Sequence, residues 1–186
     1  MLEHCATACD LVAKQAAQDD KALEGITSFF DLSALDITGN MIPFKKFEGD
    51  VTILTNVASF CGYTDSHYKG LVQLWNDVKD TGRINLLAFP CNQFGAQEPK
   101  PIWEIGNFVA DYGVEFTMMD KIDVNGPQAS PVYKFLKREA GPSAIGWNFA
   151  TYFVVGPDGS VQSHSGVGPM DLKDVALNLI ASGEEL

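Results

Sequence analysis

One junction in the chain reads Asn56-Val-Ala-Ser-Phe-Cys61-Gly-Tyr-Thr64 and gives the strongest indication of the fold. Before it, residues 51–58 form an apolar run rich in Val, Ile and Leu, which predicts a buried strand. After it, apolar side chains recur every three or four residues over 65–80, which predicts a helix. Cys61 therefore lies between a strand end and a helix start, where backbone N–H groups and the helix dipole favour a thiolate.

The junction holds one cysteine rather than a pair. A thioredoxin-like dithiol motif places a second cysteine three residues after the first, and Thr64 occupies that position. Any redox chemistry here is therefore that of a single thiol. A lone free cysteine is by itself more often an inert buried residue, so the chemical interpretation of Cys61 needs further support.

Composition limits the classes of partner. The 186 residues are most simply one domain, large enough to bury a real core. A formal net charge of −11 argues against nucleic acid or an anionic membrane surface as the main partner. No apolar run approaches the ~20 residues that a membrane span requires.

The chain contains four cysteines, at positions 5, 9, 61 and 91. They are too few and too unevenly spaced for a disulfide framework, which favours a reducing compartment. The N-terminus lacks the basic start and apolar core of a signal peptide, and its acidic residues argue against a transit peptide. We expect a cytoplasmic protein, or an organellar one if a targeting segment has been removed.

The order of elements predicts an α/β fold. Residues 1–25 are expected to form an amphipathic helical extension, and 26–186 the domain proper. A hairpin over 29–44, turning at Gly39-Asn40, comes first. Strands are then expected at 51–58, 84–89, 152–155 and 160–164, helices at 65–80, 102–112, 132–136 and 172–180, and mixed strand and loop at 116–124. A βαβ unit followed by a ββα unit is the thioredoxin plan: a central mixed sheet flanked by helices.

Four further segments carry a family resemblance. They are Leu87-Ala-Phe-Pro-Cys-Asn-Gln-Phe-Gly-Ala-Gln-Glu-Pro99, Lys121-Ile-Asp-Val-Asn-Gly126, Pro131-Val-Tyr-Lys-Phe-Leu136 and Trp147-Asn-Phe149. Together with the Cys61 junction, and in this order, they resemble the glutathione peroxidase family. The resemblance runs from about Phe29 to the C-terminus and leaves out only the N-terminal extension.

The resemblance implies a catalytic tetrad of Cys61, Gln97, Trp147 and Asn148. Cys61 matches the peroxidatic cysteine or selenocysteine, and the other three match its polar partners. A free thiol has a pKa near 8.5, so only a few per cent is thiolate at neutral pH. Neutral N–H donors aimed at the sulfur favour the charged form and can hold the peroxide oxygens. The thiolate would attack a peroxide oxygen, become a sulfenic acid and be restored by an external thiol.

The three polar members of the tetrad also have ordinary structural interpretations. Gln97 could be a surface loop residue, Trp147 a core residue and Asn148 a turn residue. Cys91 follows Pro90 at a strand end and is interpreted as structural. No metal, haem or flavin is implied, because sulfur performs the redox step.

The chain departs from the family pattern at two places. Many cysteine-type members that use thioredoxin carry a resolving cysteine in the helix after the Gly-x-Gln-Glu-Pro loop, and Ala110 fills that position here. In lacking this resolving cysteine the chain resembles the selenocysteine-type, glutathione-using members. Glutathione and thioredoxin both remain candidate reductants. A native selenocysteine at position 61 also remains open. Only nine residues, 138–146, separate the helix expected at Pro131–Lys137 from Trp147, whereas tetrameric members carry a long insertion there. The short form resembles the monomeric phospholipid-hydroperoxide type.

We therefore expect a thiol-dependent peroxidase that reduces hydrogen peroxide and organic or lipid hydroperoxides. Two alternatives belong to other classes. The first is a redox sensor or relay that passes the oxidation of Cys61 to a partner protein. The second is a catalytically silent binding domain that keeps the thioredoxin fold, although the intact tetrad argues against silence.

Overall fold

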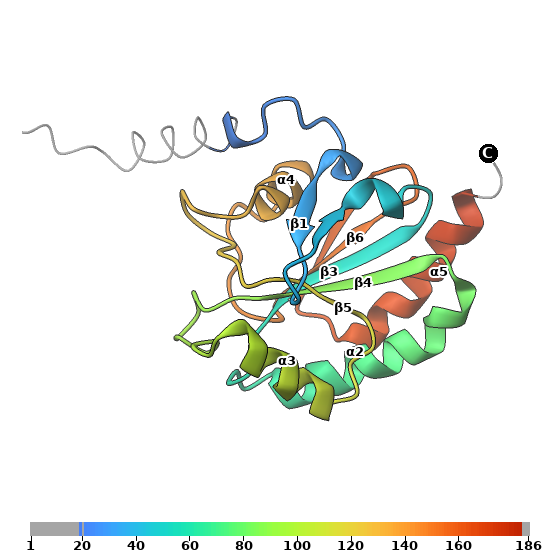
Figure 1. Cartoon of the computed structure of the whole chain (residues 1–186). Helices are drawn as coiled ribbons and strands as arrows, with labels where there is room; N and C mark the ends of the chain where they lie inside the picture. The colour runs from blue at the N-terminus through green and yellow to red at the C-terminus, as the bar shows by residue number, and fades with distance from the viewer. Residues whose placement is uncertain (1–18, 20, 184–186) are drawn as a thin grey trace, which may run out of the picture.

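The computed structural model describes residue 19 and residues 21–183, arranged around one five-stranded sheet (Figure 1). Most of the helical extension predicted over 1–25 lies outside these residues, so that prediction and the boundary at residue 26 stay predictions. The strands run in the order β5-β4-β3-β6-β7. They are β3 (Val51–Val57), β4 (Ile84–Pro90), β5 (Thr117–Met118), β6 (Thr151–Val155) and β7 (Val161–Ser165).

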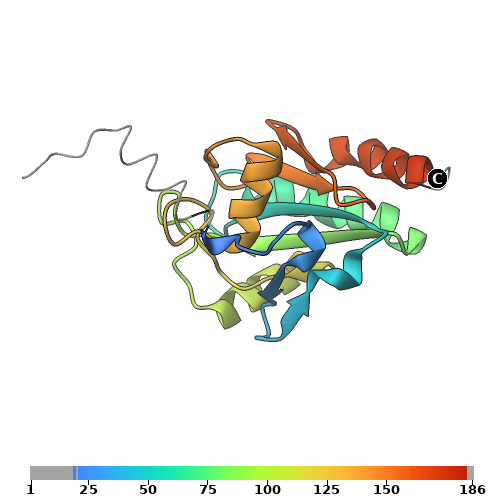
Figure 2. The ribbon, with the colours of Figure 1, turned by 90° about the horizontal axis from the view of Figure 1, so that it is seen from above.

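Helices cover both faces of this sheet, as Figures 1 and 2 show. Helices α2, α3 and α5 lie on one face and α4 lies on the other, together with the N-terminal hairpin. The helices are α2 (Thr64–Val78), α3 (Ile102–Asp111), α4 (Pro131–Ala140) and α5 (Leu172–Gly183). No helix in the described part of the chain has the length and apolar character that crossing a membrane requires.

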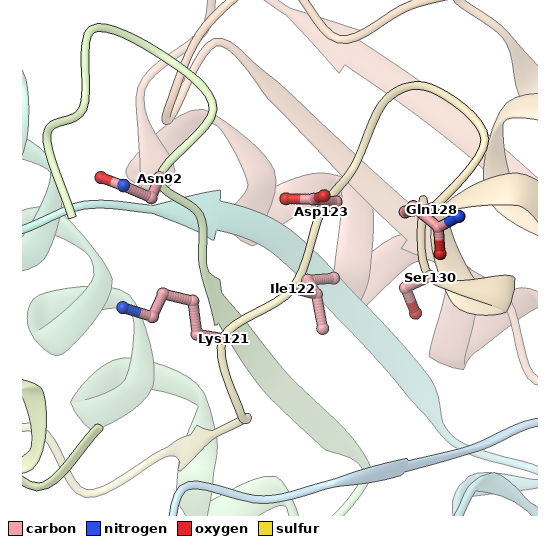
Figure 3. A pocket seen from close by; sticks show the side chains of 6 residues that line it. All are labelled: Asn92, Lys121, Ile122, Asp123, Gln128 and Ser130. Carbon is pink, nitrogen blue, oxygen red and sulfur yellow. The ribbon is translucent and has the colours of Figure 1, made fainter. Parts of the chain in front are cut away.

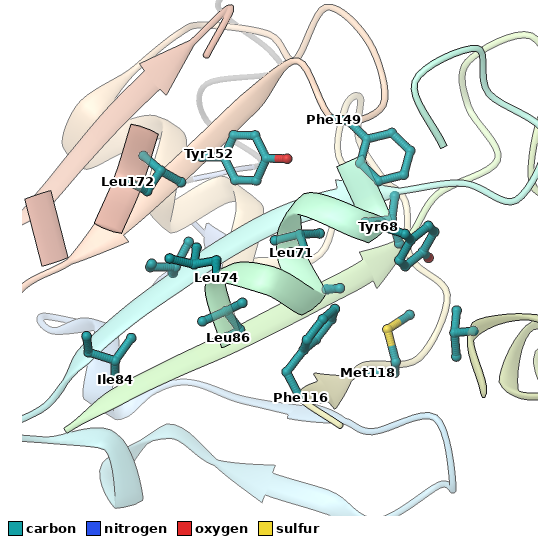
Figure 4. Packing of buried hydrophobic residues seen from close by; sticks show 14 of the residues in the cluster. Tyr68, Leu71, Leu74, Ile84, Leu86, Phe116, Met118, Phe149, Tyr152 and Leu172 are labelled. Atoms are coloured by element: carbon teal, nitrogen blue, oxygen red, sulfur yellow. The ribbon is translucent and has the colours of Figure 1, made fainter. Parts of the chain in front are cut away.

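Strand alternation divides the core into two layers. All seven residues of β3 are buried, because helices cover both of its faces. Val51, Ile53 and Val57 contact the α2 and α5 layer, whereas Leu54 contacts the α4 layer. Figure 4 shows the first layer, in which Tyr68, Leu71 and Leu74 of α2 pack over the strands. Full burial of one such side chain contributes about 1.5–3 kcal/mol.

The N-terminal hairpin is confirmed as a small separate sheet of β1 (Ser33–Leu35) and β2 (Met41–Pro43). Its turn is stabilised by the Asp36 carboxylate, which accepts hydrogen bonds from the backbone N–H groups of Thr38 and Asn40. Gly39 lies in the left-handed region at φ +85°, where a side chain would be strained. Single-turn 3₁₀ helices η1 (Phe29–Asp31) and η2 (Phe44–Phe47) place aromatic rings against the sheet.

The pairing directions bring three loops to one edge of the sheet. Strand β3 is parallel to β4 and antiparallel to β6, as the predicted βαβ and ββα units require. The residues after β3, those after β4 and those before β6 must therefore meet at the same edge. The mixed strand and loop predicted over 116–124 is confirmed, with the strand limited to Thr117 and Met118, which pair with β4.

Candidate active site

The loop that carries Cys61 is fastened by the first residue of α2. The Thr64 hydroxyl accepts a hydrogen bond from the Cys61 N–H at 3.0 Å and donates one to the Ala58 carbonyl at 2.6 Å. The Thr64 N–H donates to the Cys61 carbonyl at 3.0 Å. Cys61 is 7% exposed and belongs to the core layer under α2. Thr64, which occupies the position of the second cysteine in a dithiol motif, thus fixes the backbone of Cys61.

Gln97 reaches the same edge from the loop after β4. The Phe60 N–H donates to the Gln97 carbonyl at 3.0 Å, which ties this loop directly beside Cys61. Gly95 and Ala96 both have positive φ, +60° and +52°, and turn the chain sharply before Gln97. The Gln97 side chain is half-buried, and its Oε1 is buried without a hydrogen-bond partner among the described residues.

Trp147 and Asn148 lie in the loop before β6. Asn148 is fully buried, and its Oδ1 accepts a hydrogen bond from Asn56 Nδ2 at 2.9 Å. Its Nδ2 is buried and has no partner in the described part of the chain. Trp147 is 39% exposed, and its ring packs against Phe94 with centroids 5.7 Å apart. The indole N–H makes no hydrogen bond to the described residues.

The structure therefore gathers all four predicted positions at one edge of the sheet, but it does not join them through the sulfur. No hydrogen bond to Cys61 Sγ is present among the described residues. Catalytic hydrogen bonds are often long before substrate binds. Ala96 and Phe149, at φ +52° and +63°, are the non-glycine residues with positive φ in the described chain. Each directly follows or precedes a predicted site residue, and such strain collects at functional sites.

Comparison with known proteins fixes the family. The family model described as "Glutathione peroxidase" matches residues 29–137, more than half of the chain. The chain belongs to the glutathione peroxidase family. A protein of Nicotiana sylvestris named "Probable phospholipid hydroperoxide glutathione peroxidase" is 44% identical over 138 residues, 72% of this chain and 80% of its own length. This glutathione peroxidase is accordingly a thiol-dependent oxidoreductase that acts on hydroperoxides.

Solved structures agree with this assignment. T. cruzi GPX1 superposes with a TM-score of 0.67 at 31% identity, covering 83% of this chain and 97% of that one. A thioredoxin family thiol:disulfide interchange protein of Chlorobium tepidum has a TM-score of 0.61 at 16% identity, over 80% and 92% of the two chains. The second likeness shows the fold alone and confirms the predicted thioredoxin plan.

The groups around the peroxidase site are mostly neutral. The His67 ring is half-buried, and its Nδ1 lies 2.6 Å from the Tyr152 hydroxyl. Burial lowers the pKa of His67 and raises that of Tyr152, so both side chains are neutral at pH 7 and share one hydrogen bond whose donor depends on the imidazole tautomer. The ammonium of Lys100 lies 5.6 Å from the centre of the Phe60 ring and pairs with Glu104.

The buried carboxyl of Glu98 supports the loop after β4, which carries Gln97. Glu98 is fully buried, and its Oε2 accepts a hydrogen bond from the Ser59 hydroxyl at 3.1 Å. Burial raises its pKa, although Ser59, Lys121 and Lys100 act in the opposite direction. Sequence reasoning missed Glu98, Ser59 and the side-chain role of Thr64. The adjacency of Glu98 to Gln97 was the available signal.

Cys91 occupies a different environment from Cys61. It is fully buried in the layer under α4, and burial raises its pKa to about 11. A thiol with that pKa stays protonated at neutral pH and is a poor nucleophile. The contrast favours the structural interpretation of Cys91.

Two hollows open near this edge of the sheet. The first, about 280 Å³, is lined by Tyr63, His67, Phe149 and Ala150 together with 166–168, none of which is a Lys, Arg, Asp or Glu. The second, about 510 Å³, lies between the loop after β4 and residues 121–130, and Figure 3 shows Asn92, Lys121 and Asp123 lining it. None of the four predicted site residues lines either hollow, but the first includes Phe149, which directly follows Asn148 in the sequence.

Proposed function

We propose that Cys61 is the peroxidatic residue of this thiol peroxidase. The Cys61 thiolate attacks one oxygen of a hydroperoxide, and the S–O bond forms as the O–O bond breaks. The other oxygen leaves as alkoxide or hydroxide, takes a proton and departs as alcohol or water. Sulfur is oxidised to sulfenic acid and the peroxide is reduced. The observation that carries this proposal is the buried, unpartnered Nδ2 of Asn148 at the sheet edge that also holds Cys61.

Neutral donors supply the electrostatics in this proposal. The Asn148 amide, the Gln97 amide and the Trp147 indole N–H stabilise the thiolate and the charge that develops on the leaving oxygen. A buried amide is already desolvated, so its N–H dipole acts at full strength and needs no reorganisation. In this proposal these neutral donors act together with the N-terminal end of α2, which begins three residues after Cys61.

An external thiol completes the cycle in our proposal. One thiol condenses with the sulfenic acid, releasing water and forming a mixed disulfide, and a second thiol displaces Cys61. Ala110 is exposed on α3, and Cys91 is buried with a pKa of about 11, so neither offers a resolving thiolate. Glutathione and thioredoxin are the two candidate reductants.

Steady-state turnover tests the proposal. Purified protein is given hydrogen peroxide with glutathione, and separately with thioredoxin and its reductase. We expect catalytic peroxide consumption with at least one reductant. Stoichiometric oxidation without turnover, followed by transfer to a captured partner protein, would instead support the redox-relay alternative.

Bulky hydroperoxides fit the surroundings of Cys61. Phe60 and Tyr63 flank it with exposed rings, 55% and 52%, and the hollow of about 280 Å³ beyond Tyr63 carries no charged side chain. An apolar organic substituent loses little on entering such a site. We propose organic and lipid hydroperoxides as substrates beside hydrogen peroxide.

The chain is a monomer in this proposal, because the loop between α4 and β6 is short where tetrameric members carry an insertion. Sedimentation at micromolar concentration is expected to give about 20.2 kDa. A stable species of four times that mass contradicts it.

The free thiols of Cys61 and Cys91 support a reducing compartment, and the cytoplasm is our proposed location.

A further inference from the structure

Asn56 makes an unusual set of contacts at the end of β3. Pairing between β3 and β6 ends at Thr55 and Tyr152, so Asn56 faces the loop before β6 instead of a strand. Its carbonyl accepts a hydrogen bond from the Phe149 N–H at 2.8 Å. Its Nδ2 donates to the Trp147 carbonyl at 3.3 Å and to Asn148 Oδ1 at 2.9 Å. One fully buried residue therefore holds three consecutive residues.

The direction of the Asn56–Asn148 bond decides what Asn148 can offer. A side-chain amide has an acceptor end and a donor end. Asn56 supplies the donor, so Asn148 turns its oxygen toward Asn56 and keeps both N–H groups of Nδ2 free. A donor is the group that a thiolate or a leaving oxyanion needs, whereas an oxygen in the same place would repel both.

The loop that Asn56 holds is also strained. Phe149 has φ +63°, a conformation that costs a non-glycine residue about 1–3 kcal/mol and persists only where neighbouring contacts hold it. The bond from the Phe149 N–H to the Asn56 carbonyl is one such contact. Another is the packing of the Phe149 ring against Tyr68, with centroids 5.6 Å apart (Figure 4).

We infer that Asn56 is a positioning residue for the peroxidase reaction, because it fixes the Asn148 amide with its N–H groups available to Cys61 and holds the Trp147 backbone. The inference rests on the proposed function, in which Asn148 is a donor to the Cys61 thiolate. Asn56 acts through its neighbours and touches no reacting atom.

The test compares Asn56→Leu with Thr52→Val. Thr52 lies on the same strand and face, is fully buried, and its hydroxyl has no partner among the described residues, so it is a matched control. Stopped flow gives the rate of Cys61 oxidation by hydrogen peroxide, and mass spectrometry of the Cys61 peptide gives the pH dependence of its alkylation. We expect Asn56→Leu to slow oxidation about tenfold, on the order of the net contribution of one hydrogen bond, and to move the alkylation midpoint to higher pH. Thr52→Val should change neither, and a folded Asn56→Leu variant with the wild-type rate and pH profile overturns the inference.

A double-mutant cycle separates this inference from the proposed function. If Asn56 acts through Asn148, adding Asn56→Leu to Asn148→Ala should slow oxidation by less than twofold further. If Asn148→Ala alone slows oxidation and Asn56→Leu multiplies that loss tenfold, the positioning role fails while the proposed function stands. If Asn148→Ala has no effect on the rate, the donor role of Asn148 and the inference fail together.

A second variant covers the case in which Asn56→Leu does not fold. Asn56→Asp keeps the shape of the side chain but replaces the NH₂ group by an oxygen, which favours rotation of the Asn148 amide and removes its donors from the site. We expect oxidation at least as slow as in Asn56→Leu. A folded Asn56→Asp variant that reacts at the wild-type rate overturns the inference by itself.

Discussion

Replacement of Cys61 by serine should abolish peroxide reduction, with a loss of at least about a thousandfold. A serine hydroxyl at this position is neither ionised at neutral pH nor able to pass through a sulfenic acid. Replacement of Cys91 by serine should keep most of the activity, because that thiol is buried in the opposite core layer with its pKa raised to about 11. Turnover of hydrogen peroxide with the preferred reductant is the measurement.

The pair of cysteine variants controls for stability. Both thiols are buried, so both substitutions are expected to cost some free energy of unfolding. Thermal unfolding of the two variants shows whether a loss of activity follows a loss of structure. Equal activity losses in the two variants, with both folded, would remove the assignment of Cys61 as the peroxidatic residue.

The three donor variants should each slow the oxidation of Cys61. Asn148→Ala is expected to have the largest effect, on the order of a hundredfold, because its amide is fully buried and desolvated. Gln97→Ala and Trp147→Phe should cost about tenfold, since both side chains are partly exposed and water can replace a lost donor. Trp147→Phe keeps a ring to pack on Phe94 and removes only the indole N–H. Stopped-flow oxidation with excess peroxide is the measurement.

Trp103→Phe is the matched control for the tryptophan. Trp103 is 63% exposed on α3 and undergoes the same chemical change away from the proposed tetrad. Cys61 of the Trp103→Phe variant should be oxidised at the wild-type rate. If all three donor variants also react at that rate, the tetrad is a packing feature of the sheet edge and plays no part in catalysis.

The sequence predicted the elements whose signal is local. Strand β3 was recognisable from its unbroken apolar run, because helices cover both of its faces. Helix α2 showed its period through residues that include Tyr68, Leu71 and Val78, which are buried in the core layer against the sheet. For 116–124 no strand bounds could be predicted within the mixed strand and loop, because apolar residues near 116–119 enter the core from a loop as well as from a strand. Propensity and period do not distinguish those two cases.

The candidate site was predicted less completely, because most of its contacts are long-range. The residues Cys61, Gln97, Trp147 and Asn148 came from family resemblance, and pairing directions then explain why they meet. The bonds from Asn56 to Trp147 and Asn148 cross 91 and 92 residues, so no local pattern indicates them. In the sequence, Thr64 was considered only as the residue that stands in place of the second cysteine of a dithiol motif. The hydrogen bonds of its hydroxyl with Cys61 and Ala58 depend on the folded turn and are evident only in the structure.

The central claim is that Cys61 alone takes up the peroxide oxygen and waits for an external thiol. The most direct measurement treats the reduced protein with one equivalent of hydrogen peroxide, adds a sulfenic-acid trap and maps all four cysteines by non-reducing peptide mass spectrometry. We expect the trapped sulfenic acid on Cys61, conversion to a mixed disulfide when glutathione replaces the trap, and little disulfide within the chain. A label on Cys91 in place of Cys61, or a dominant disulfide from Cys61 to Cys5 or Cys9, would contradict it.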